Sequence, residues 1–224
     1  MFDLPPIVLA ALTGFVFGLL LSIPVGPVNL TIINEGARRG FVWAGLIGLG
    51  ATTMEVIYCA IAFTGFASFF KQGYVKAAME LFSFVFMLVL GTKFLFATTV
   101  PATNKIEERI EEKLHPHSAF MTGFVRVMGN PGVLIFWIVL AAHFISREWV
   151  RSEGVDKLAC IGGVAAGTGL WFCGLSWAVS FGHQKFSEKT LLRMEHISGI
   201  TLLVLGFAHG THIVWQMAHH KISS

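Results

Sequence analysis

One acidic residue stands in the middle of a long apolar stretch of this sequence. Glu55 lies about fourteen residues from either end of the segment 41–70. A charge at that depth of a bilayer costs at least ~2.5 kcal/mol, and ionisable groups kept there face a cavity and act in transport. Three roles fit Glu55: binding a substrate amine, carrying a coupling proton, or pairing with a buried cation such as Arg126 or Lys93.

Helix-breaking residues gather in another apolar stretch, where no charge occurs from Ile7 to Asn34. Pro24, Gly26 and Pro27 fall within four positions there, and Asn29 follows. Proline removes a backbone donor, and an unpaired backbone group in hydrocarbon costs several kcal/mol. Two prolines around a glycine, followed by asparagine, favour a functional break over a plain kink that neighbouring helices satisfy.

A second break is expected in the segment 119–145, which contains "VRVMGNPGVLIFW". Gly129, Asn130, Pro131 and Gly132 interrupt the apolar pattern there. Paired interruptions in the two halves of a chain point to a transport site, because half-helices direct positive dipole ends at anions and free carbonyls at cations. A zwitterion such as an amino acid needs both.

The composition sets the class of protein that contains these features. The chain is 54% hydrophobic, only 13% charged, and has a mean hydropathy of +0.70. Soluble domains carry about 25% charge, so these values indicate an integral membrane protein. The net charge of +3 comes without a basic face of interleaved aromatics, so nucleic acid is not an expected partner. Asp3 stands where a signal peptide needs positive charge, so the first apolar run is expected to be a retained helix.

Six apolar segments are each long enough to cross a bilayer about 30 Å thick. The expected fold is therefore an all-α membrane protein with six transmembrane helices, the first and fourth of them broken. The stretch 100–118 between the third and fourth segments is expected to be either a short amphipathic helix or a solvated linker. The six segments are 7–34, 41–70, 78–99, 119–145, 158–182 and 194–217.

The two halves of the chain resemble each other. "ELFSFVFMLVLG" aligns without gaps on "EHISGITLLVLG", which places Glu80 on Glu195. "IGLGATTMEVIYCAIAFTG" from Ile47 aligns on "IGGVAAGTGLWFCGLSWAV" from Ile161. These matches occur in the same order at similar offsets, so they indicate an internal duplication.

The duplication predicts how the domains are arranged. Residues 1–99 form one three-helix repeat, residues 100–118 connect, and residues 119–224 form the second repeat. Three is an odd number of crossings, so the second repeat enters from the opposite side as an inverted repeat. Lys and Arg are slightly more frequent on the side of Arg38 and Arg39, which predicts that both termini lie outside the cytoplasm.

The motifs resemble a known family. "SIPVGPVN", "GFVRVMGNP", "GATTME" and the "LVLG" endings are similar to signatures of the lysine exporter (LysE/RhtB-type) translocator family, over essentially the whole chain. The resemblance implies a six-helix protein of the bacterial inner membrane that exports amino acids and related small metabolites. It also implies coupling to an ion gradient, with a proton as the expected ion.

The resemblance carries over to particular residues, with two departures. Val25 is inserted where the family often reads Pro-Gly-Pro, and Gly132 replaces a frequent lysine, which removes a partner for a substrate carboxylate. Arg126, four residues before Asn130, either supplies that anion contact or is an interfacial anchor. The expected substrate-binding residues are Pro24, Gly26, Pro27, Asn29, Glu55, Arg126, Asn130 and Pro131.

Other readings remain open at this point. His209 and His212 are three apart and share a helix face, so a divalent metal cation exporter using them with Glu55 is the alternative function. A membrane scaffold without transport is a third. No nucleotide-binding or hydrolase motif is visible, so neither a cofactor nor enzymatic activity is expected. Small residues at 163–169 allow close helix packing and permit a homodimer.

Overall fold

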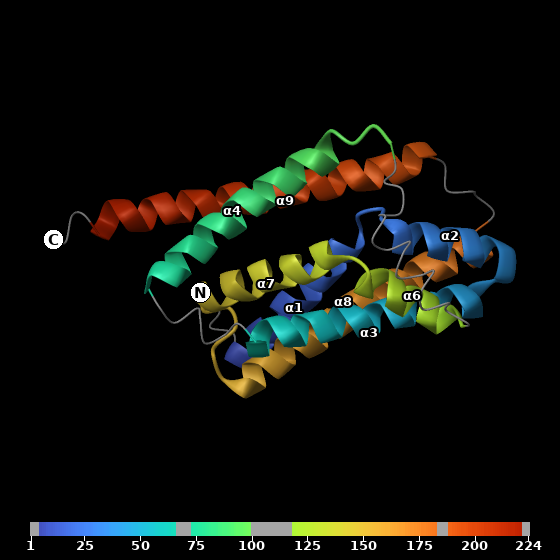
Figure 1. Cartoon of the computed structure of the whole chain (residues 1–224), viewed down its shortest axis with the longest axis horizontal. Helices are drawn as coiled ribbons and strands as arrows, with labels where there is room; N and C mark the ends of the chain where they lie inside the picture. Colours follow the sequence, from blue (N-terminus) through green and yellow to red (C-terminus); the bar gives the residue numbers. More distant parts are fainter. Residues whose placement is uncertain (1–4, 66–72, 100–117, 183–187, 221–224) are drawn as a thin grey trace.

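The computed structural model describes residues 5–65, 73–99, 118–182 and 188–220, and the regular structure in these ranges is entirely helical. The predicted connecting segment 100–118 falls almost wholly outside them. Figure 1 shows the helices as a bundle with α4 and α9 along one edge. The helices are α1 (Pro6–Ser22), α2 (Pro27–Arg39), α3 (Phe41–Gly65), α4 (Gly73–Leu95), α6 (Ala119–Met128), α7 (Pro131–Ser146), α8 (Gly154–Phe181) and α9 (Glu188–His220).

Glycines bring two helix pairs into backbone contact. α1 packs along α8, where a Cβ added at Gly14 would overlap the carbonyl of Cys160. α3 packs along α6, where a Cβ added at Gly123 would overlap the carbonyl of Ile47. Close backbone approach through small residues is the usual way helices associate where lipid offers no hydrophobic driving force.

The small residues at 163–169 serve this internal packing. Gly163 and Gly167 both lie against the backbone of α1. Part of the stretch that was predicted to permit a homodimer therefore packs against α1 of the same chain.

α4 and α9 form a layer of their own. They lie side by side in Figure 1, and α9 makes its extensive contacts with α4. Gly199 of α9 approaches the backbone of α4 at Gly91 and Leu95. α7 is the bundle helix that packs against α4. We call α4 with α9 the outer pair, and α1, α2, α3, α6, α7 and α8 the bundle.

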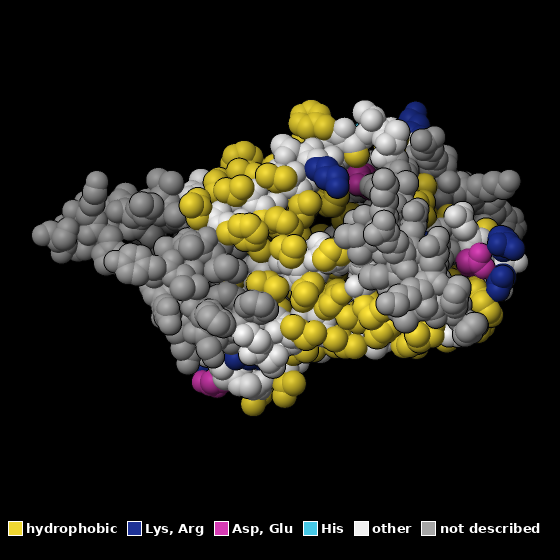
Figure 2. Space-filling model, in the orientation of Figure 1, with side chains coloured by type: hydrophobic (Ala, Val, Ile, Leu, Met, Phe, Trp, Pro, Cys, Tyr) yellow, Lys and Arg dark blue, Asp and Glu magenta, His cyan; other side chains and the backbone are white. Residues whose placement is uncertain are grey.

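Large apolar side chains cover much of the described surface. Val42, Trp177 and Phe207 are 72%, 62% and 60% exposed. In Figure 2, hydrophobic side chains cover the middle of the described face, while charged groups lie mostly toward its ends. This distribution suits a surface in lipid, where exposing apolar side chains has no penalty.

Both predicted breaks are present. α1 and α2 are bent by 71° and α6 and α7 by 66°, and each bent pair is apolar enough to be one span. Three unbroken helices also qualify as spans, so the described residues offer three to five. α4 contributes only a shorter apolar helix, Phe84–Leu95, by the same criteria. The count of six therefore stays a prediction.

The glycine contact between α8 and α1 makes a prediction about stability. Gly163→Ala adds a Cβ that overlaps the Ala11 carbonyl, so we expect overpacking to lower the free energy of unfolding by about 1–3 kcal/mol. Gly162→Ala is the matched control, because a Cβ there meets open space and alanine favours helix by roughly 0.5–1 kcal/mol. Thermal unfolding in detergent measures both, and equal melting temperatures would contradict the packing.

Candidate functional site

The first break is held by the side chain of a buried asparagine. Pro24 has no N–H, so the carbonyl four residues before it lacks its helical donor. Asn29, 2% exposed, donates through Nδ2 to the carbonyls of Ser22 at 2.8 Å and Pro24 at 2.6 Å. Its Oδ1 accepts a bond of 3.2 Å from Trp171 Nε1 of α8. Asn29 thus uses its donors and its acceptor to fix the break.

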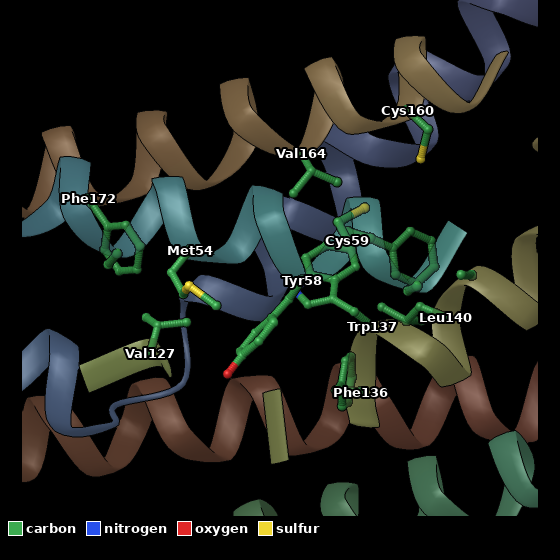
Figure 3. Close-up of a cluster of buried hydrophobic side chains, with 14 of the residues drawn as sticks. Met54, Tyr58, Cys59, Val127, Phe136, Trp137, Leu140, Cys160, Val164 and Phe172 are labelled. Atoms are coloured by element: carbon green, nitrogen blue, oxygen red, sulfur yellow. The ribbon is translucent and has the colours of Figure 1, made fainter. Parts of the chain in front are cut away.

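Side chains also form hydrogen bonds to the backbone at the second break. α6 ends at Met128, and Asn130 caps α7 by accepting from the Gly132 N–H at 3.0 Å. Tyr58 of α3 donates its hydroxyl to the Met128 carbonyl at 2.8 Å. Figure 3 shows the Tyr58 ring reaching from α3 toward the region of Val127. These bonds satisfy backbone groups that the interruption leaves open.

A cavity of about 370 Å³ lies between the bundle and the outer pair. The bundle contributes the end of α1, the first break, Glu55 of α3 and the start of α7, and the outer pair contributes faces of α4 and α9. A smaller cavity of about 100 Å³ lies against the same two breaks. The larger one is lined by Phe17, Leu20, Leu21, Pro24, Val25, Gly26, Pro27, Glu55, Phe86, Leu90, Lys93, Phe94, Asn130, Gly132, Val133, Phe136, Trp137, Glu195, Ser198, Thr201, Leu202 and Leu205.

Two carboxylates face the larger cavity. Glu55 lines both cavities and accepts a hydrogen bond from Trp137 Nε1 of α7. Glu195 of α9 is 2% exposed, and its Oε2 accepts a hydrogen bond of 3.2 Å from the Val25 N–H. Glu195 therefore bonds to the first break, and Glu55 bonds to α7, the helix that follows the second break. Burying a charge is costly unless it is hydrogen-bonded, so these contacts explain how both are accommodated.

The structure brings most of the predicted site residues together. Pro24, Gly26, Pro27, Glu55 and Asn130 line both cavities. The remaining three are placed differently: Asn29 and Arg126 line the smaller cavity alone, and Pro131, at the first position of α7, lines neither.

The reason for grouping Arg126 with Asn130 changes. The spacing of four residues assumed one continuous helix, but α6 ends at Met128 and Asn130 is already the cap of α7. The 66° bend, rather than helical periodicity, brings the two residues to the wall of one cavity.

Several residues at the site were not predicted from the sequence. In the sequence, Tyr58 and Trp137 look like ordinary core aromatics. Only their hydrogen bonds, to the Met128 carbonyl and to Glu55, show that they belong to the site. Figure 3 shows both within the cluster where α3 faces α7. Glu195 did carry a signal, since it is an acid within an apolar segment and the alignment of the halves places it on Glu80. Lys93, considered only as a partner of Glu55, lines the same cavity as Glu195 and acts on it electrostatically.

The metal alternative finds no support in the described part of the chain. No group of three or more His, Cys, Asp or Glu side chains gathers there. The side chains of His209 and His212 lie outside the described residues.

Comparison with known proteins gives the family. The model of the LysE type translocator family matches residues 19–211. A curated protein of Bacillus subtilis (strain 168), named "Putative amino acid efflux protein YcgF", is 30% identical over 207 residues, which cover 92% of this chain and 97% of that protein. No solved structure matches the chain.

The role of Asn29 at the first break is testable through stability. Asn29→Asp replaces a donor that serves two carbonyls with an acceptor, so we expect the free energy of unfolding to fall by about 1–3 kcal/mol. Asn34→Asp, at an exposed position of α2, is the matched control and is expected to leave stability nearly unchanged. Thermal unfolding in detergent measures both. Equal stability of the two variants would show that Asn29 does not hold the break.

Proposed function

The chain belongs to the LysE type translocator family, and from this premise we propose that it exports an amino acid or a related small metabolite across the bacterial inner membrane, driven by an ion gradient. Membership makes it a multi-pass membrane transporter and not an enzyme. The observation that carries the proposal is the cavity of about 370 Å³ between the bundle and the outer pair, which residues of both broken helices line. Its size falls within the range of about 300–1,000 Å³ found for small-molecule sites.

The wall chemistry supports a substrate with an amine and an apolar part. Glu55 provides a carboxylate for an ammonium group, beside the rings of Trp137 and Phe136. Phe17 and Phe86 add further apolar surface. The relative's printed name, an amino acid efflux protein, agrees with this class. L-leucine and L-phenylalanine are therefore the first substrates to test.

Helix pairing supports the inverted repeat. If α1 with α2, α3 and α4 form one repeat and α6 with α7, α8 and α9 the other, exchanging them turns the α1–α8 pair into the α6–α3 pair, and both pairs are present. Gly14 meets Cys160 in one and Gly123 meets Ile47 in the other, at nearly equivalent positions of the aligned halves. We propose six crossings in repeats of residues 1–99 and 119–224, with both termini outside the cytoplasm.

The position of the cavity supports alternating access. It lies where the bundle meets the outer pair, so movement of one against the other would open it to one side of the membrane at a time. A proton is the proposed coupling ion, since the cavity holds two carboxylates. A homodimer remains a proposal: Gly169 and Gly174 of α8 have open space beside them in the single chain.

The role of Glu55 in substrate binding makes the central prediction. Glu55→Gln removes the charge that would pair with the substrate amine, and losing one partner of a buried charge pair costs about 2–5 kcal/mol. We expect substrate affinity to fall at least ~30-fold and export to cease at ordinary substrate levels. The measurement is metabolite efflux from cells, followed by uptake of labelled leucine and phenylalanine into vesicles.

The control for this prediction is Glu153→Gln, which makes the same chemical change at a 66% exposed side chain outside the helices' membrane-facing parts. Immunodetection in the membrane fraction shows whether each variant inserts. Normal export by an inserted Glu55→Gln variant would remove Glu55 from the mechanism. Equal efflux by cells with and without the protein, for every metabolite measured, would contradict the export proposal itself.

A further inference from the structure

A hydrogen bond joins the outer pair to the first break. Glu195 comes from α9, and Val25, whose N–H it accepts, lies between the end of α1 and the start of α2. The residues are 170 positions apart in the chain. Both line the larger cavity, so the bond spans the boundary between the bundle and the outer pair.

The ionisation state of Glu195 decides the strength of this bond. An ionised carboxylate accepts a charge-assisted hydrogen bond, which is roughly twice as strong as a neutral one. A proton on Glu195 removes the charge, so the remaining carbonyl oxygen is only a neutral, weaker acceptor for the Val25 N–H. The weaker bond holds the outer pair less firmly against the first break, so protonation favours an arrangement in which the two have moved apart.

Other charged groups lie around Glu195 and interact with its carboxylate. Lys93 of α4 lines the same cavity and attracts the ionised carboxylate. His196, the next residue on α9, bonds to the Ala97 carbonyl. Glu55 of α3 is the other acid of the cavity, and the lining segments of α1, the first break and α7 contribute no charged side chain. Glu195 is thus the acid of this cavity that comes, like Lys93, from the outer pair.

We propose that Glu195 is the binding site of the coupling proton, separate from Glu55, which binds the substrate amine. The inference rests on the proposed export function. A proton from outside binds a carboxylate oxygen of Glu195, the bond to the Val25 N–H weakens, and the outer pair moves relative to the bundle. Release of the proton to the cytoplasm restores the carboxylate and the bond. The substrate crosses outward with Glu195 ionised, so one proton enters for each substrate exported.

The test is transport by Glu195→Gln in proteoliposomes. Glutamine keeps an oxygen that accepts from the Val25 N–H but binds no proton. Vesicles with a lumen about two pH units more acidic than the medium let wild-type protein concentrate labelled L-leucine up to ~100-fold, at one proton per substrate. We expect Glu195→Gln to reach a ratio of about one, while it still exchanges labelled for unlabelled leucine at equal pH.

Three comparisons make the result specific. Glu195→Asp retains a titratable group and is expected to keep gradient-driven accumulation, and Glu153→Gln is expected to match the wild type. Accumulation by Glu195→Gln equal to the wild type would overturn the proposal. Loss of both accumulation and exchange by a folded Glu195→Gln would also overturn it, because Glu195 would then serve substrate binding. Wild-type protein that moves neither leucine nor phenylalanine would contradict the proposed substrate class instead.

A second measurement needs no substrate and keeps Glu195 intact. Spin labels at Val204 of α9 and Leu170 of α8, both exposed, report the distance between the outer pair and the bundle. Cys173, the exposed cysteine of the described residues, is replaced by serine to avoid a third label. We expect the distance to shift by more than ~2 Å between about pH 8 and about pH 4. An unchanged distance would overturn the proposal even if Glu195→Gln fails to fold.

Discussion

The constraint on which this structure depends is that no backbone N–H or C=O group can be left unpaired in hydrocarbon. Two helices are interrupted at that depth, and the chain satisfies the freed groups with side chains. Asn29 of α2 donates back across the first break to the carbonyls of Ser22 and Pro24, while Glu195, from another helix, accepts from the Val25 N–H. Tyr58 donates to the end of α6 at the second break. The breaks therefore determine where the buried polar groups must be.

The need to pair these backbone groups also explains where the cavity lies. Each break redirects the chain, by 71° and 66°, and the partners come from helices far away in sequence. Glu55, bonded by Trp137 of α7, lines the same cavity as the residues of the first break. The result is a site that contains polar groups from both halves of the chain. Bonding to the breaks or to other helices is enough to bring these groups together.

The sequence predicted the features that depend on local chemistry. Pro24 and Pro27 identified the first break because proline acts on its own turn of helix, and Glu55 stood out because a charge in an apolar run needs a reason. Features that depend on packing were missed. Trp137 is an unremarkable apolar residue until its N–H is seen to meet a carboxylate. The helical spacing assigned to Arg126 failed because the break changes the direction of the chain.

The two acids of the cavity differ in what their hydrogen bonds join. Glu55 is bonded by a side chain from α7, which belongs to the bundle, as α3 does. A change in the charge of Glu55 therefore alters a contact within the bundle alone. Glu195, which belongs to the outer pair, bonds to the backbone of the bundle at Val25. Val25 lies between α1 and α2 and is part of neither helix. A ligand shifts a conformational equilibrium only through a difference in its interaction with the two states. A proton on Glu195 has such a difference, since the bond that it weakens exists only while the outer pair lies against the first break.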